Sequence, residues 1–161
     1  MKRNICFAIL LSIIIVHIGC KKDENNPIAP TVVASEVWGF ISSNDSANHS
    51  EQTLEKKSDG SVAVNGTWYF VYQGSTVQCS ISSGTAIIAD TVISMTTQGT
   101  ANDPSAPTGY QSSAFTSNVT GIAHNGKSSG TWSLTFSTYG WPSMLQGTYT
   151  ATRKSGSGIT K

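Results

Sequence analysis

Apolar and hydroxyl-bearing residues alternate along most of this chain, and the alternation strongly favours β structure. The clearest stretch places Trp132, Leu134 and Phe136 in alternate positions, with Ser133 and Thr135 between them. Successive side chains of a β-strand point to opposite faces, so a period of two predicts a strand with one buried face. We therefore expect the three large apolar side chains to face a core.

Two further segments show the same period. Residues 76–81 would turn Val77, Cys79 and Ile81 inward, and residues 148–152 would turn Tyr149 and Ala151 inward. This pattern predicts that Cys79 is a small buried hydrophobe rather than a reactive thiol. Residues 50–57 are the only segment that could hold a short helix, and Gly60 would soon end it.

Turn signals separate the alternating segments. They are dipeptides that end in glycine, namely Asp59-Gly60, Asn65-Gly66, Gln73-Gly74, Ser83-Gly84, Gln98-Gly99 and Asn125-Gly126. Asn-Gly and Asp-Gly accept the positive φ angles of two-residue hairpin turns, so at least two tight hairpins are expected. The strongest is Asn125-Gly126, which would join residues 118–124 to a strand that starts near Lys127. Residues 101–109, with two prolines, predict a longer loop.

This arrangement predicts an all-β domain of about seven to nine antiparallel strands in a meander, because the helices that a parallel sheet needs do not alternate with the strands. A small closed barrel and a two-sheet sandwich both satisfy the pattern. Gly66-Thr67-Trp68 resembles the Gly-x-Trp opening of lipocalin and avidin barrels, and Arg153 resembles their late-strand arginine. The resemblance implies a calycin-like barrel. The segment of residues 70–75 has apolar residues where avidins place polar ligand contacts, so biotin is not implied.

The first residues have the layout of a secretory signal. Lys2 and Arg3 precede an apolar run of 14 residues, 5–18, which is broken only by Ser12 and His17. A helix that stays in the bilayer needs about 20 such residues, so a retained transmembrane helix is the weaker interpretation.

The four residues His17-Ile18-Gly19-Cys20 resemble the bacterial lipobox, with His17 at the place where Leu is usual. The resemblance implies cleavage after Gly19 and acylation of Cys20, including palmitate, and several acyl chains make an essentially permanent membrane anchor. Residues 21–26 resemble the charged export tag of Bacteroidota surface lipoproteins, which implies an outer-membrane, cell-surface location. The alternative to the lipobox is an ordinary secreted protein that is cut nearby and has a chance cysteine, and the alternative to the export tag is a solvated linker.

The expected organisation has four parts. Residues 1–19 form the signal peptide, residues 20–30 the lipidated cysteine and a flexible tether, residues 31–154 the β domain, and residues 155–161 a flexible tail. Cys6 would leave with the signal and Cys20 would carry lipid, so Cys79 stands alone. No disulfide framework and no cysteine-based metal site are expected.

The β domain has few charges. Between Gly60 and Thr152 the charged residues are Asp90, Asp103 and Lys127. This composition offers no basic footprint for nucleic acid and no facing pair of carboxylates for glycoside hydrolysis. No cofactor and no enzymatic activity are expected.

Two catalytic motifs match by letter but lack their structural setting. Residues 121–128 fit the phosphate-loop pattern G-x-x-x-x-G-K-S, and residues 126–130 fit the nucleophile-elbow pattern G-x-S-x-G. Both motifs require a following helix, whereas a strand pattern follows here. Asn125-Gly126 is better interpreted as a hairpin tip.

The remaining candidates for a site are aromatic residues outside the strand patterns. Tyr139 and Trp141 lie in a connecting segment and suit stacking on sugars or apolar ligands, although a loop tryptophan can equally plug a barrel end. Asp45-Ser46-Ala47 and Asp90-Thr91-Val92 resemble the Bacteroidota O-glycosylation acceptor, which makes Ser46 the candidate site and Thr91, in an expected strand, a lesser one.

Two functions remain open at this point. The first is a membrane-tethered binding module for a glycan or a small apolar ligand. The alternative is a structural lipoprotein that contacts another envelope protein and has no ligand pocket.

Overall fold

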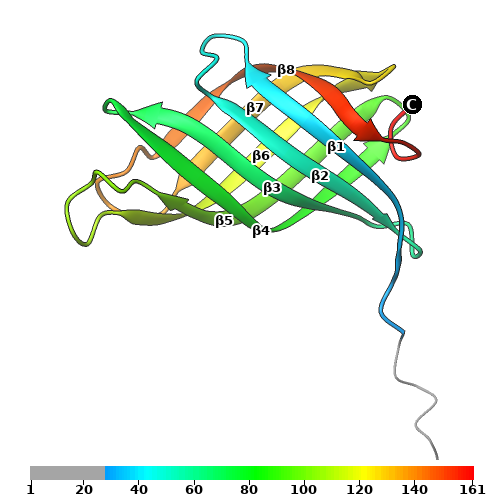
Figure 1. Ribbon diagram of the computed structural model, residues 1–161, viewed down its shortest axis with the longest axis horizontal. Coiled ribbons are helices and arrows are strands. Elements are labelled where there is room, and N and C mark those ends of the chain that lie inside the picture. Colours follow the sequence, from blue (N-terminus) through cyan, green and yellow to red (C-terminus); the bar gives the residue numbers. More distant parts are fainter. Residues whose placement is uncertain (1–27) are drawn as a thin grey trace, which may run out of the picture.

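The computed structural model describes residues 28–161 of the chain and shows one closed β-barrel (Figure 1). Each strand pairs antiparallel with the next, and β8 pairs with β1 to close the barrel. The predicted all-β meander is confirmed, and of its two forms the barrel is the one observed. The eight strands are β1 (Val32–Ser42), β2 (His49–Lys57), β3 (Val62–Tyr72), β4 (Ser75–Ala89), β5 (Val92–Asn102), β6 (Ser112–His124), β7 (Lys127–Phe136) and β8 (Met144–Gly156).

The short helix that the sequence allowed at residues 50–57 does not form, because these residues belong to β2. Ser50, Gln52 and Leu54 alternate inward and are each at most 3% exposed. Glutamates and lysines between and after them face outward or lie partly exposed, so residues with high helix propensity here cover a barrel wall. Across residues 28–161, no helix has the length and apolar character needed to cross a membrane.

The two ends of the barrel differ in what they carry. Since an even number of strands runs up and down, both ends of the described chain, residues 28–161, lie at one end of the barrel, which we call the terminal end. The turns at residues 58–61, 90–91 and 125–126 lie there too. The opposite end, the loop end, carries the connections at residues 43–48, 73–74, 103–111 and 137–143 (Figure 1).

Aromatic and aliphatic side chains fill the barrel interior. Trp38, Trp68 and Tyr149 are each at most 2% exposed, and the rings of Trp68 and Trp132 lie 5.7 Å apart. An eight-stranded barrel is just wide enough for side chains to fill it. The inward positions predicted for Trp132, Leu134, Phe136, Val77, Cys79, Tyr149 and Ala151 are confirmed, and Ile81 packs partly buried against the same core.

The glycine dipeptides divide into turns and strand positions. Asp59-Gly60, Gln73-Gly74 and Asn125-Gly126 form the predicted turns, and Asn125 and Gly126 have φ of 51° and 71°. The turns expected at Asn65-Gly66, Ser83-Gly84 and Gln98-Gly99 are wrong, because these pairs lie inside β3, β4 and β5. The first two lie at or beside register shifts, where glycine permits close approach of neighbouring backbones.

Residues 155–161, which the sequence predicted to be a flexible tail, fold back over the terminal end. β8 continues to Gly156, and Thr160 is 8% exposed. The carboxylate of Glu36, which is fully buried, accepts hydrogen bonds from the Thr160 hydroxyl at 2.8 Å and from the backbone N–H groups of Ile159 and Thr160 at 3.1 Å each. Arg153 donates to the same carboxylate at 3.0 Å. A buried carboxylate that needs donors thus holds the tail in place.

Candidate functional site at the loop end

A hollow of about 400 Å³ lies at the loop end of the barrel. Its lining comes from the β3–β4 turn and from the loops that follow β5 and β7. The lining residues are Tyr72, Gln73, Ser75, Asp103, Ser105, Ala106, Pro107, Tyr110, Gly140 and Trp141. Aromatic rings and small polar groups therefore meet at one place.

The loop at residues 103–111 is held by its own first residue. Asp103 is 7% exposed, and its Oδ1 accepts hydrogen bonds from the Ser105 backbone N–H at 3.0 Å and from the Ser105 hydroxyl at 2.6 Å. The Asp103 backbone N–H donates to the carbonyl of Gln111 at 2.9 Å. Ser105 also contacts the hydroxyl of Ser75. These bonds order the loop.

Trp141 joins two loops at the edge of the hollow. Its Nε1–H donates to the carbonyl of Tyr110 at 2.8 Å, and its ring centroid lies 5.4 Å from that of Phe136. It is partly buried against the core. Trp141 therefore packs against the core at the barrel end and also lines the hollow.

Tyr139 has a different setting. It is 88% exposed and does not contribute to the lining of the hollow, although the adjacent Gly140 does. Tyr110 is 46% exposed, and a Cβ at Gly140 would lie 3.3 Å from its ring. The loop end thus presents one fully exposed ring, one half-exposed ring and one partly buried ring.

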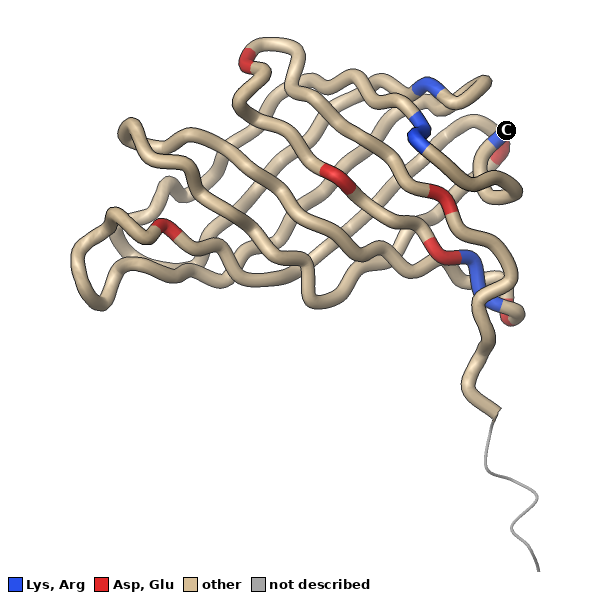
Figure 2. The backbone as a smooth tube through the Cα atoms, viewed as in Figure 1, with Lys and Arg blue, Asp and Glu red and all other residues tan. Residues whose placement is uncertain are grey.

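Charge is concentrated away from the central wall of the barrel. Figure 2 shows acidic and basic residues mainly on β1, β2, the end of β8 and the turns of the terminal end. The strands β4, β5 and β6 contain no Asp, Glu, Lys or Arg, and β7 contains only Lys127 at its first position. Uncharged side chains therefore form the outer wall there.

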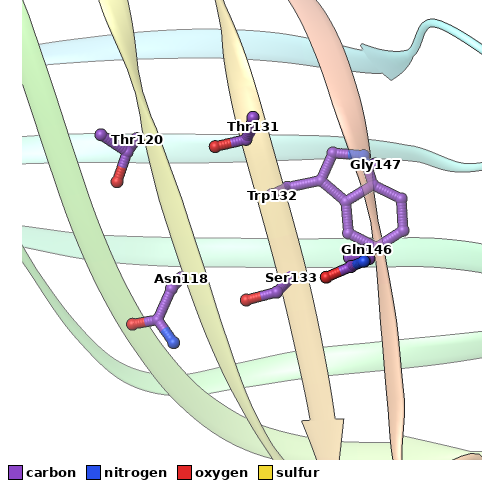
Figure 3. A pocket seen from close by; sticks show the side chains of 7 residues that line it. All are labelled: Asn118, Thr120, Thr131, Trp132, Ser133, Gln146 and Gly147. Carbon is purple, nitrogen blue, oxygen red and sulfur yellow. The ribbon is translucent and has the colours of Figure 1, made fainter.

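A shallow hollow of about 560 Å³ lies on this uncharged wall (Figure 3). Asn118, Thr120, Thr131, Ser133 and Gln146 surround it with hydroxyl and amide groups. Trp132 lies beneath Gly147, because a Cβ at position 147 would come within 3.1 Å of its indole. Since Trp132 is only 5% exposed, this hollow offers hydrogen bonds but little ring surface.

The other residues singled out from the sequence lie apart from the loop-end hollow. Ser46 is exposed in the β1–β2 loop, and Thr91, expected in a strand, lies in the β4–β5 turn. Cys79 is fully buried, and burial raises the pKa of its thiol to about 12. Cys20 lies outside the described residues.

The phosphate-loop pattern at residues 121–128 spans a hairpin. His124 and Lys127 are paired residues on either side of the Asn125-Gly126 turn, and the strand β7 follows directly. The described residues contain no group of three or more His, Cys, Asp or Glu side chains placed to hold a metal ion.

Sequence reasoning missed Tyr110 and Asp103 as parts of this site. The prolines indicated a loop at residues 101–109, but the contact of Tyr110 with Trp141 joins residues 31 positions apart. The pairing of β5 with β6 and of β6 with β7 brings these loops together.

A scan against protein-family models, a search of curated proteins and a search of solved structures found no match to this chain.

Proposed function

We propose that this chain is a lipid-anchored cell-surface module that binds a neutral glycan at the loop end of its barrel. The observation that carries the proposal is the grouping of Tyr110, Tyr139 and Trp141 around or beside a polar hollow at the end opposite the chain termini. Aromatic faces stack on the apolar faces of sugars, and nearby hydroxyl and amide groups supply hydrogen bonds.

The packing of the interior favours a glycan over a small apolar ligand. A ligand inside the barrel would have to displace buried rings such as Trp68 and Tyr149, which are at most 2% exposed. Protein interiors pack as densely as organic crystals, so such displacement is costly. A rim site with exposed rings requires no rearrangement of the core.

The anchor follows from the lipobox resemblance at Cys20, and the fold adds a reason why an anchor suits this site. The described chain begins at the terminal end, so a tether attached there holds the loop end away from the membrane. Labelling of cells with an alkyne fatty acid is expected to mark the parent protein and not Cys20→Ser. Equal labelling of both proteins would contradict the anchor.

The binding site is tested with a panel of neutral glycans and the purified full chain. We expect Tyr139→Ala and Tyr110→Ala each to weaken binding about two- to twelvefold, the range that corresponds to one aromatic contact of about 0.5–1.5 kcal/mol. Trp141→Phe removes the indole hydrogen bond but keeps an aromatic ring. The change in tryptophan emission that the parent shows on binding should be absent in this variant.

The matched control is Ile122→Ala, because Ile122 is an exposed large side chain, 61% accessible, on the wall of the barrel toward the terminal end. It should bind as the parent does. If the three loop-end variants also bind as the parent does, the glycan site is not at this end. If no glycan of the panel binds, and an envelope protein is captured in a stoichiometric complex, the structural role in contact with that protein replaces the glycan-binding function.

A further inference from the structure

A second hollow, of about 550 Å³, lies on the outer wall where β8, β1, β2 and β3 run side by side. We call it the Gly39 groove. Its outer lining consists of Gly39, Ile41, Ser46, His49, Glu51, Thr67, Tyr69, Thr152 and Lys154. These residues are separate from the lining of the loop-end hollow.

Strand register arranges the groove into two rows of different chemistry. In one row Ile41 pairs with His49, and His49 pairs with Tyr69, so aliphatic and aromatic groups stand side by side. The rings of His49 and Tyr69 stack with centroids 5.0 Å apart and an interplanar angle of 19°. This row forms a wall of one aliphatic and two aromatic side chains.

The other row, two residues away along each strand, is polar. Gly39 pairs with Glu51 on one side and with Thr152 on the other, and Glu51 pairs with Thr67. Lys154 crosses above Gly39, since a Cβ at Gly39 would come within 2.6 Å of its Cε. Its ammonium reaches Glu51 at 2.7 Å. Glycine at position 39 therefore makes room for this ion pair.

The charges in the groove balance each other. Glu51 and Lys154 are each 57% exposed in their side chains and neutralise one another, so neither a net anion nor a net cation is favoured as ligand. His49 Nδ1 lies 3.0 Å from the carbonyl of Ala47, and because a carbonyl only accepts, Nδ1 carries the donated proton. In the neutral ring Nε2 is then an acceptor.

We propose that the Gly39 groove binds a neutral hexose unit, whose apolar face lies along the Ile41, His49 and Tyr69 wall and whose hydroxyls bond to the polar row. A hexose carries both surfaces on one rigid ring, and its vicinal hydroxyls match an alternation of carboxylate, ammonium and threonine groups. The inference rests on the proposed function only for the class of ligand, since its residues differ from those of the loop end.

The test is amide chemical-shift mapping of the full chain with methyl glucoside, methyl galactoside and N-acetylglucosamine. Glucuronate and glucosamine serve as charged comparators. We expect the neutral sugars to shift the amides of Ile41, His49 and Tyr69. Tyr69→Ala and Glu51→Gln should each weaken that response about tenfold, which corresponds to one lost ring contact or one lost charge-assisted bond.

The matched control is Gln146→Ala on the hydroxyl-lined hollow of β6, β7 and β8, which should leave the response unchanged. Glu51→Gln changes an exposed group and keeps the fold testable even if Tyr69→Ala unfolds. The inference is overturned if only the charged sugars shift these amides, or if Glu51→Gln responds as the parent does. Shifts confined to residues 103–111 and 137–143 would overturn it and support the loop-end site. If the sugars shift the groove amides in the parent and in Tyr139→Ala, and shift none at the loop end, the groove is supported and the loop-end site is contradicted.

Discussion

Glu36 shows how one buried carboxylate can order a chain terminus. Burial alone raises the pKa of Glu36, but hydrogen bonds from the backbone and hydroxyl of Thr160, from Trp38 and from Ile159 outweigh that effect and hold the pKa below its ordinary 4.5. The carboxylate is therefore more stable as an anion in the folded chain than in the unfolded chain.

The sign of the pH dependence follows from this lowered pKa. The contribution of Glu36 to the free energy of unfolding is fully present above its ordinary pKa and is lost as the pH falls through the lower, folded-state value. We expect Glu36→Gln to reduce the free energy of unfolding at pH 7 by about 2–3 kcal/mol, because Arg153 and two backbone donors lose a charged acceptor. Urea unfolding at pH 7 and pH 3 measures this, and the difference from the parent should shrink at pH 3.

Glu51→Gln is the control, because the ion pair of Glu51 with Lys154 is exposed and contributes at most about 1 kcal/mol. A Glu36→Gln protein as stable as the parent at pH 7 would show that the tail does not depend on the carboxylate. An unchanged difference between pH 7 and pH 3 would show that its charge is irrelevant.

Strand β3 needs a glycine at position 66. Gly66 has a φ of 144°, and a Cβ there would lie 2.1 Å from the carbonyl oxygen of Glu51 on β2. The strand register shifts between Ala63 and Gly66, so this position lets β3 bend around a narrow barrel.

We expect Gly66→Ala to lower the free energy of unfolding by about 2–4 kcal/mol, since it adds both backbone strain and a clash with a neighbouring strand. Gly74→Ala is the matched control, because Gly74 also has a positive φ, 83°, but nothing lies within 4 Å of its Cβ position. That control should cost about 1 kcal/mol. Equal losses for the two variants, measured by thermal or urea unfolding, would refute the role of close strand approach.

The same glycines show what local patterns predict and what they do not. The alternation of Trp132, Leu134 and Phe136 predicted their burial correctly because side-chain direction in a strand is a local property. Whether an Asn-Gly pair turns the chain or lies in a bulge depends on the neighbouring strand, so Asn65-Gly66 and Asn125-Gly126 look alike in sequence but differ in structure.

At the scale of the whole molecule, the order of the strands around the closed barrel creates both candidate sites. The loop position of Tyr139 and Trp141 was predictable from the break in alternation before Met144. The contact of Trp141 with Tyr110 was not, because it requires β5, β6 and β7 to be neighbours. The Gly39 groove was likewise beyond sequence reasoning, since it needs β8 to lie beside β1.

Closure of the barrel also brings the start of β1 and the residues after β8 together at the terminal end. A Cβ at Gly158 would lie 3.6 Å from the Cβ of Ala34, so a short linker could join the end of the chain to the start of β1. A circular permutant with new ends between Asn44 and Asp45 would keep every strand pair, but its chain ends would lie at the loop end of the barrel. Behind a lipidated leader, that protein would stand inverted, with Tyr139 and Trp141 turned toward the bilayer. Comparing ligand capture by the two orientations on cells and in solution would separate what the site binds from which way it must face.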